Sequence, residues 1–117
     1  MRNFRQYDFW VDSKSLAKDV YLLLSGFPGE ERYALCDQLR RAVVSIPSNI
    51  AEGAGRETEI EFARFLDIAL GSACEVETQI ELAYDLNYIS VHKRDEIIFK
   101  LNSIERRIAA MVKRLRR

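Results

Sequence analysis

Apolar residues in this chain recur at alternating intervals of four and three residues, and this spacing restricts the fold more than any other feature. The longest such series lies within residues 62–83. Its members are Phe62, Leu66, Ala69, Ala73, Val76, Ile80 and Ala83. These intervals place side chains on one face of an α-helix, whereas a strand would need intervals of two. The pattern therefore predicts a long helix with a coiled-coil-like apolar seam.

Three other segments show the same spacing, and residues that start or stop helices lie between the segments. Gly26 and Pro28 follow the first segment, where glycine tolerates the turn and proline cannot continue a helix. Thr58 and Glu61 have the spacing of a capping box, and Ser90 suits the cap of the last helix. We therefore expect helices at residues 9–25, 30–54, 58–87 and 91–115.

Composition and connection length together predict the architecture. With 48% hydrophobic residues and only 5 Gly and 2 Pro, a disordered chain and a turn-rich β-sandwich are both excluded as first hypotheses. Short connections between long helices favour antiparallel neighbours. The sequence thus predicts an all-α fold, an antiparallel up-down-up-down four-helix bundle, as one domain spanning residues 1–117.

Pro47 falls inside the second predicted helix. Proline lacks a backbone N–H and its ring collides with the preceding turn, so we expect a kink at this residue. A break into two helices is the alternative, but the apolar spacing continues through the proline. Ser48 and Asn49 are unfavourable inside a helix unless their side chains find partners. We expect them to satisfy the backbone groups that Pro47 frees.

Charge is balanced over the whole chain, with 18 basic and 18 acidic residues, but it is unevenly distributed. Residues 1–56 carry a net charge of +1, residues 57–92 carry −7, and residues 93–117 carry +6. The overall balance argues against a strongly basic nucleic-acid-binding protein. The last predicted helix can nevertheless present a local basic face to a polyanion. The alternative is that the acidic and basic helices neutralise each other as neighbours.

The basic residues of the last helix are our candidates for nucleic-acid contact. Lys93, Lys100, Arg107 and Arg114 recur every seven residues and so form one stripe beside the apolar seam. Favourable interaction with the helix C-terminus explains cations in the last turn only, and does not explain the stripe. The candidate nucleic-acid-binding residues are Lys93, Lys100, Arg106, Arg107, Lys113, Arg114, Arg116 and Arg117.

Residues suited to catalysis or to metal binding are few. His92 is the only histidine, so neither a ferritin-like di-iron pattern nor a Ser/His/Asp triad is supported. Cys36 and Cys74 lack the spacing of metal ligands, and we expect reduced thiols in a cytoplasmic protein. No apolar run reaches the ~20 residues of a membrane helix. We expect a non-enzymatic protein with no metal, no cofactor and no membrane span.

The first half of the third predicted helix is apolar beyond its seam. A helix that is apolar around most of its circumference is buried on several sides. In a chain of 117 residues this pattern predicts a subunit interface in addition to a core. The predicted oligomer-interface residues are Ile60, Phe65 and Ile68.

Two stretches of the chain resemble a known family. They are QLRRAVVSIPSNIAEG at residues 38–53 and EFARFLDIALGS at residues 61–72. Both are similar to motifs of the four helix bundle protein family, first described as proteins encoded in intervening sequences of bacterial 23S ribosomal RNA genes. The resemblance covers residues 4–115. The matching family-signature positions are Arg40, Arg41, Pro47, Ser48, Asn49, Glu52, Gly53, Arg56 and Arg64.

The resemblance implies a four-helix bundle that assembles into a ring-shaped homopentamer. A related branch, the accessory protein of diversity-generating retroelements, binds a reverse transcriptase and is associated with nucleic acid. No family catalytic residue exists to carry over. The resemblance therefore implies a non-enzymatic accessory protein whose partners are itself, RNA or DNA, and a reverse transcriptase-like protein. The alternative is a protein–protein interaction scaffold with no nucleic-acid role.

Overall fold

The computed structural model describes residues 2–117, so Met1, which the predicted domain includes, lies outside the described residues. This part of the chain forms four α-helices and two short 3₁₀ turns, and contains no strand. The elements are η1 (Phe4–Gln6), α1 (Asp8–Leu24), η2 (Gly29–Glu31), α2 (Leu35–Ala54), α3 (Glu59–Asp85) and α4 (Val91–Leu115). The predicted all-α, four-helix fold is confirmed.

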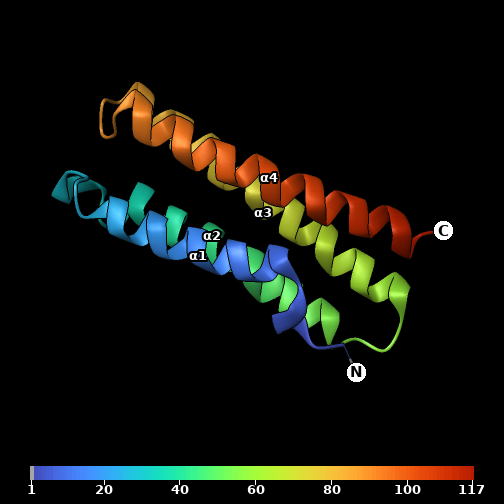
Figure 1. The fold of residues 1–117 in the computed structure, drawn as a ribbon. Helices are drawn as coiled ribbons and strands as arrows, with labels where there is room; N and C mark the ends of the chain where they lie inside the picture. The colour runs from blue at the N-terminus through green and yellow to red at the C-terminus, as the bar shows by residue number, and fades with distance from the viewer. Residues whose placement is uncertain (1) are drawn as a thin grey trace.

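The helices lie along the long axis of an elongated particle with extents of 44 × 23 × 19 Å. In Figure 1, α1 lies beside α2, α3 lies beside α4, and the connections fall at alternate ends of the bundle. A helix as long as α3 rises about 40 Å. The five residues 86–90 span at most about 17 Å, so α4 has to start near the end of α3 and run back along it.

Both predicted N-caps are confirmed. The Oγ1 atom of Thr58 accepts a hydrogen bond from the backbone N–H of Glu61 at 3.1 Å. The Oγ atom of Ser90 accepts from the N–H of Lys93, also at 3.1 Å. These side chains satisfy backbone donors that the first turn of a helix leaves without partners.

The second helix begins at Leu35, so the prediction that residues 30–34 belong to it is wrong. Pro28 is extended, Gly29–Glu31 form the 3₁₀ turn η2, and Ala34 has non-helical angles of φ −119° and ψ −101°. The Oε1 atom of Glu31 accepts from the N–H of Leu35 at 3.4 Å. Glu31 therefore accepts a hydrogen bond from the first residue of α2 while lying outside the helix, instead of lying in the first turn of a longer helix.

The α2 helix continues through Pro47 without interruption, so the alternative of two separate helices is wrong. A bend at this residue stays a prediction. The carbonyl that Pro47 frees belongs to Val43, four residues earlier. The Nδ2 atom of Asn49 instead donates to the carbonyl and the hydroxyl of Ser45, at 2.8 and 2.9 Å. The expectation that Asn49 replaces the lost hydrogen bond is therefore wrong.

The apolar seam of α3 forms the centre of the core. All seven residues of the series within 62–83 are fully buried. Three of the seven are alanines, and small side chains let the neighbouring helices approach closely. Among the helix pairs in contact, the packing is most extensive between α2 and α3 and least extensive between α1 and α4.

Gly53 lies where α2 approaches α3 closely. A Cβ atom at this position would lie 2.6 Å from the Cβ of Phe65 and 3.1 Å from the ring of Phe62. Any larger residue would have to push the two helices apart. The signature glycine thus has a packing role in the last turn of α2, which ends one residue later at Ala54.

The connection between α3 and α4 is held to the opposite hairpin by Tyr88. Its hydroxyl donates to the Oε2 atom of Glu31 at 2.7 Å, and its ring packs against Phe27 with centroids 5.3 Å apart. Asn87 precedes it in a left-handed conformation with a φ of 65°. The Glu31 hydrogen bond is the main cause that raises the pKa of Tyr88 to about 12.

We predict that Gly53→Ala destabilises the fold by about 1–3 kcal/mol, because the added methyl group overpacks the contact between α2 and α3. Denaturant unfolding measures this change. The matched control is Gly29→Ala, whose added Cβ would have no heavy atom within 4 Å, and whose effect should stay within about 0.5 kcal/mol. Equal effects of the two substitutions would contradict the packing role of Gly53.

The Tyr88 hydrogen bond predicts a specific dependence of stability on pH. The folded pKa lies near 12 and the ordinary value is 10.0, so unfolding favours release of the proton between these values. The contribution of Tyr88 to stability should be complete below pH 10 and lost as the pH rises toward 12. The measurement is the difference in unfolding free energy between the native chain and Tyr88→Phe as a function of pH. A difference that stays constant through this interval would refute the prediction.

Candidate nucleic-acid interface

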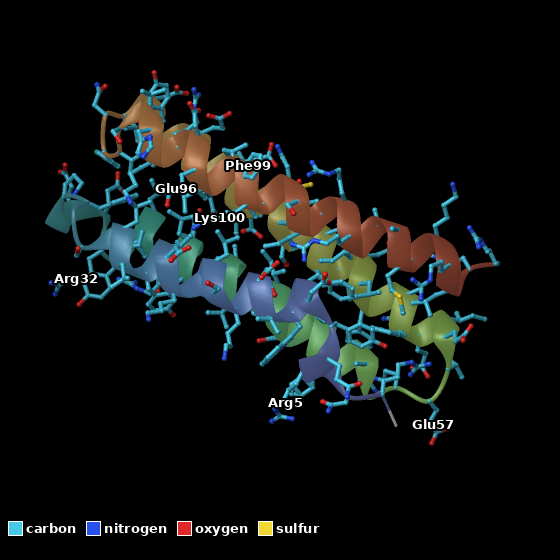
Figure 2. All side chains as sticks on the ribbon, viewed as in Figure 1. Arg5, Arg32, Glu57, Glu96, Phe99 and Lys100 are labelled. Atoms are coloured by element: carbon cyan, nitrogen blue, oxygen red, sulfur yellow. The ribbon has the colours of Figure 1, made fainter. Side chains whose placement is uncertain are left out.

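Two of the four residues in the basic stripe of α4 form ion pairs with α1. The Nζ atom of Lys100 lies 2.8 Å from Oδ2 of Asp19, and this hydrogen bond raises the pKa of Lys100. The guanidinium of Arg107 lies 2.8 Å from Oδ2 of Asp12 and 3.3 Å from Oδ2 of Asp8. In Figure 2, Lys100 projects from α4 into the space beside α1. Lys100 also lies 3.6 Å from Glu96 of its own helix. The acids that pair with Lys100 and Arg107 therefore come from α1 and α4, and not from α3 as the alternative interpretation expected.

Two further candidates also have acidic partners. Lys93 lies 3.9 Å from Glu96 one turn along α4. Arg116, beyond the end of α4, pairs with Asp67 of α3. Four of the eight candidate cations thus contribute to contacts within the subunit, and their charges are at least partly compensated.

The other four candidates are exposed and form no ion pair within residues 2–117. They lie on the last turns of α4 and just beyond them. These residues, which we call the α4 terminal cations, are Arg106, Lys113, Arg114 and Arg117. Because their charges are uncompensated, they are the strongest part of the predicted interface.

Acidic side chains lie along the whole length of α3. Glu75, Glu77, Glu81 and Asp85 lie on the second half of α3. Burial, followed by the nearby carboxylate of Glu77, raises the pKa of Glu105 on α4. Glu59, Glu61 and Asp67 lie on the first turns of α3, at the same end of the bundle as the α4 terminal cations, and Asp67 pairs with Arg116 there.

Several family-signature residues contribute to the fold. Gly53 lies in the close contact between α2 and α3, and Asn49 binds Ser45. Arg56 lies 3.2 Å from Glu52 and above the ring of Phe65, 4.8 Å from its centroid. These positions are engaged in contacts inside the subunit.

Three other signature residues are exposed and make no such contact. Arg41 and Ser48 lie on the outer side of α2, and Arg64 lies on α3. None of the three forms a side-chain hydrogen bond or an ion pair within the part of the chain that the structure describes. Arg40, one residue before Arg41, lies 3.7 Å from Asp37. The exposed signature positions are therefore the ones that remain accessible to a partner.

The structure also reveals basic residues on α1 that the sequence reasoning missed. Lys14 and Lys18 are exposed and lie outside every ion pair of residues 2–117. They were hidden because residues 1–56 have a net charge of only +1. The acids of α1 face α4, whereas the lysines face away from it. The positions of charges around the helix, instead of their sum along the chain, would have revealed this separation.

The predicted oligomer-interface residues lie in two different environments. Ile60 and Ile68 are 79% and 43% exposed, on the outer face of α3. Leu82, two heptads after Ile68, is 46% exposed on the same face. Phe65 is half-buried and packs against α2 beside Gly53. The exposed apolar face of α3 therefore includes Ile60 and Ile68 but not Phe65.

The described residues offer little support for a metal site or for a membrane span. Residues 2–117 contain no group of three or more His, Cys, Asp or Glu side chains that could hold a metal ion. None of their helices is long and apolar enough to cross a bilayer. Both cysteines are free: Cys36 is buried, which raises its pKa, and Cys74 is exposed.

Comparisons with known proteins identify the family. The model of the 23S rRNA-intervening sequence protein family matches residues 5–110. A crystal structure of a protein of unknown function from the S23 ribosomal protein family of Bacteroides thetaiotaomicron is similar, with a TM-score of 0.81 and 24% identity. The alignment covers 90% of this chain and 98% of that one, and at this identity it shows a shared fold alone. No curated protein matches the chain. Because the family model spans most of its length, the chain belongs to the 23S rRNA-intervening sequence protein family.

Proposed function

We propose that this protein is a non-enzymatic, homo-oligomeric accessory protein that binds nucleic acid in the cytoplasm. The observation that supports this function is the group of α4 terminal cations, which are exposed and lack acidic partners in residues 2–117. Cations that already have carboxylate partners gain less from a phosphate. The four residues without such partners are therefore the ones that should neutralise phosphates and release counterions.

Assembly would strengthen this interaction. The exposed apolar face of α3 supports self-association through Ile60 and Ile68, and the family resemblance suggests a homopentamer. A closed ring would repeat the α4 terminal cations around its axis, and the fields of the subunits would add. Modest charge on one subunit would then attract a polyanion strongly. The family description suggests RNA linked to 23S rRNA intervening sequences, and the related branch suggests a reverse transcriptase-like partner.

A protein–protein interaction scaffold is the second candidate, and Phe99 favours it. This residue is 73% exposed on α4, and Figure 2 shows it projecting from the helix beside Lys100. It lines a hollow of about 240 Å³ between α1 and α4, together with Leu16 and Ile104. Exposed aromatic side chains are enriched at protein interfaces. If the scaffold function is the correct one, nucleic acid should not bind even at low salt.

The α4 terminal cations give a direct test of nucleic-acid binding. We predict that the double variant Lys113→Gln and Arg114→Gln loses about 10-fold or more in affinity for duplex DNA. The salt slope, d log K/d log[salt], should also become shallower by about 0.9 per lost phosphate contact. Fluorescence anisotropy at several salt concentrations measures both quantities.

The matched control removes two charges from the same helix, by Lys93→Gln and Lys100→Gln. Because these lysines have acidic partners, their loss should change affinity much less. Equal losses in the two double variants would show that the effect is one of total charge. Absence of binding by the native chain at low salt would refute the nucleic-acid function.

The proposed assembly predicts a mass above that of the 13.6 kDa chain. Light scattering coupled to gel filtration should give a multiple of this mass for the native protein. The double variant Ile60→Glu and Ile68→Glu should shift it to 13.6 kDa, because charges would have to be buried in the interface. Val11→Glu with Leu22→Glu is the control, since both residues are exposed apolar side chains on α1. A native monomer would refute the assembly.

A further inference from the structure

We infer that the groove between α1 and α2 binds single-stranded nucleic acid, with a base stacked on Tyr21 and phosphates held by the arginines of the groove. This inference rests on the proposed nucleic-acid function, but it assigns a different surface and a different form of the ligand. The residues that carry it lie on the side of the molecule formed by α1 and α2, away from α4.

The first observation is the separation of charge around α1. Asp8, Asp12 and Asp19 form ion pairs with Arg107 and Lys100 of α4. These contacts draw the three carboxylates of α1 toward α4. The side of α1 that faces α2 and solvent therefore carries none of these acids.

The basic residues of α1 share that outer side with an aromatic residue. Lys14, Lys18 and Tyr21 follow one another at intervals of four and three, which places them on one face of the helix. Both lysines are exposed, and neither forms an ion pair within residues 2–117. Tyr21 is 47% exposed. This face of α1 thus presents positive charge around an accessible ring.

The second observation is the groove itself. Two hollows of about 310 and 410 Å³ adjoin each other between α1 and α2, and both are lined by Tyr21 and Arg40. Arg32 lines the first hollow and Arg41 the second. Asp37 is the only acidic side chain that lines either of them, and it lies 3.7 Å from Arg40. The groove therefore has a positive lining, with a tyrosine at the point where its two halves meet.

The basic surface extends beyond the groove toward the N-terminal end of α1. Trp10 is half-buried, and the Nζ atom of Lys14 lies 5.2 Å from its ring centroid. The guanidinium of Arg5 lies 4.5 Å from the ring centroid of Phe4. In Figure 2, Arg5 and Arg32 project from the α1–α2 side at well-separated points along the bundle. Cations and aromatic rings thus alternate along this side of the molecule.

This combination favours a single strand over a duplex. Bases in a duplex stack on one another, so their faces are inaccessible to an exposed ring. Bases of a single strand are free to stack on aromatic side chains and on guanidinium planes while cations hold the backbone. The α4 terminal cations have no aromatic residue among them, so they should bind the phosphates of single strands and of duplexes alike. The hydroxyl group of Ser48 at the edge of the groove offers an additional contact to a phosphate or a sugar.

The test compares the affinities of variants for a single-stranded RNA and for the corresponding RNA duplex. A single strand of about 12 nucleotides is used, because this length lies within the usual range of binding-site sizes. Tyr21→Ser should lose about 5-fold or more in affinity for the single strand, since stacking on an aromatic ring typically contributes at least this much. Its affinity for the duplex should not change. Tyr21→Phe should retain the single-strand affinity, because the ring remains.

Tyr33→Ser is the matched control, because Tyr33 is 84% exposed and lines neither hollow. It should leave both affinities unchanged. If Tyr21→Ser does not fold, as judged by thermal unfolding, Arg41→Gln replaces it, since Arg41 is an exposed surface residue. Arg41→Gln should weaken single-strand binding more than duplex binding.

The outcomes separate this inference from the proposed function. If Lys113→Gln with Arg114→Gln weakens binding of both RNA forms while Tyr21→Ser and Arg41→Gln change neither, the inference is overturned and the nucleic-acid function stands. Equal single-strand losses in Tyr21→Ser and Tyr33→Ser would also overturn it. If the native chain binds neither form at low salt, both the inference and the proposed function fail.

Discussion

The contact between α2 and α3 is the constraint on which the rest of the structure depends. Gly53 brings the two helix backbones close together, and the hydroxyls of Ser45 and Ser72 meet across the same pair of helices at 2.8 Å. Each of these helices forms a hairpin with an outer neighbour. Their close packing therefore sets the position of α1 relative to α4, which pack least among the neighbouring helix pairs.

That arrangement explains how a chain of zero net charge can have surfaces of opposite sign. Among the helix pairs that pack together, α1 and α4 share the fewest contacts, and three ion pairs join them. The pairs that Asp12 and Asp19 form with Arg107 and Lys100 use acids from one helix and bases from the other. Each pair compensates one acid of α1 with one base of α4. The remaining charges on α1 and at the end of α4 are positive, although the composition is balanced.

The sequence predicted the helices well because their signals are local. The spacing of the seam, the cap at Thr58 and the cap at Ser90 each depend on residues close together in the chain. The start of α2 was less predictable, since Glu31 divides its carboxylate between the Leu35 N–H and the distant hydroxyl of Tyr88. The packing role of Gly53 was not predicted either, because its neighbour Phe65 belongs to the next helix. For the candidate interface, sequence periodicity identified the cations of α4 but not which of them have acidic partners. The α1 partners of Lys100 and Arg107 lie more than 80 residues away in the chain.

The hydrogen bond between Tyr88 and Glu31 also has a mechanical consequence. The α1–α2 and α3–α4 hairpins are joined covalently only at residues 55–58, at one end of the bundle (Figure 1). At the opposite end, the tyrosine and its packing against Phe27 link the two hairpin turns through side chains alone. The backbone therefore connects the two hairpins at one end of the bundle, and the Tyr88 contact connects them at the other end. Because no backbone joins the hairpins at that end, separating them there would break only side-chain contacts, the Tyr88–Glu31 hydrogen bond among them.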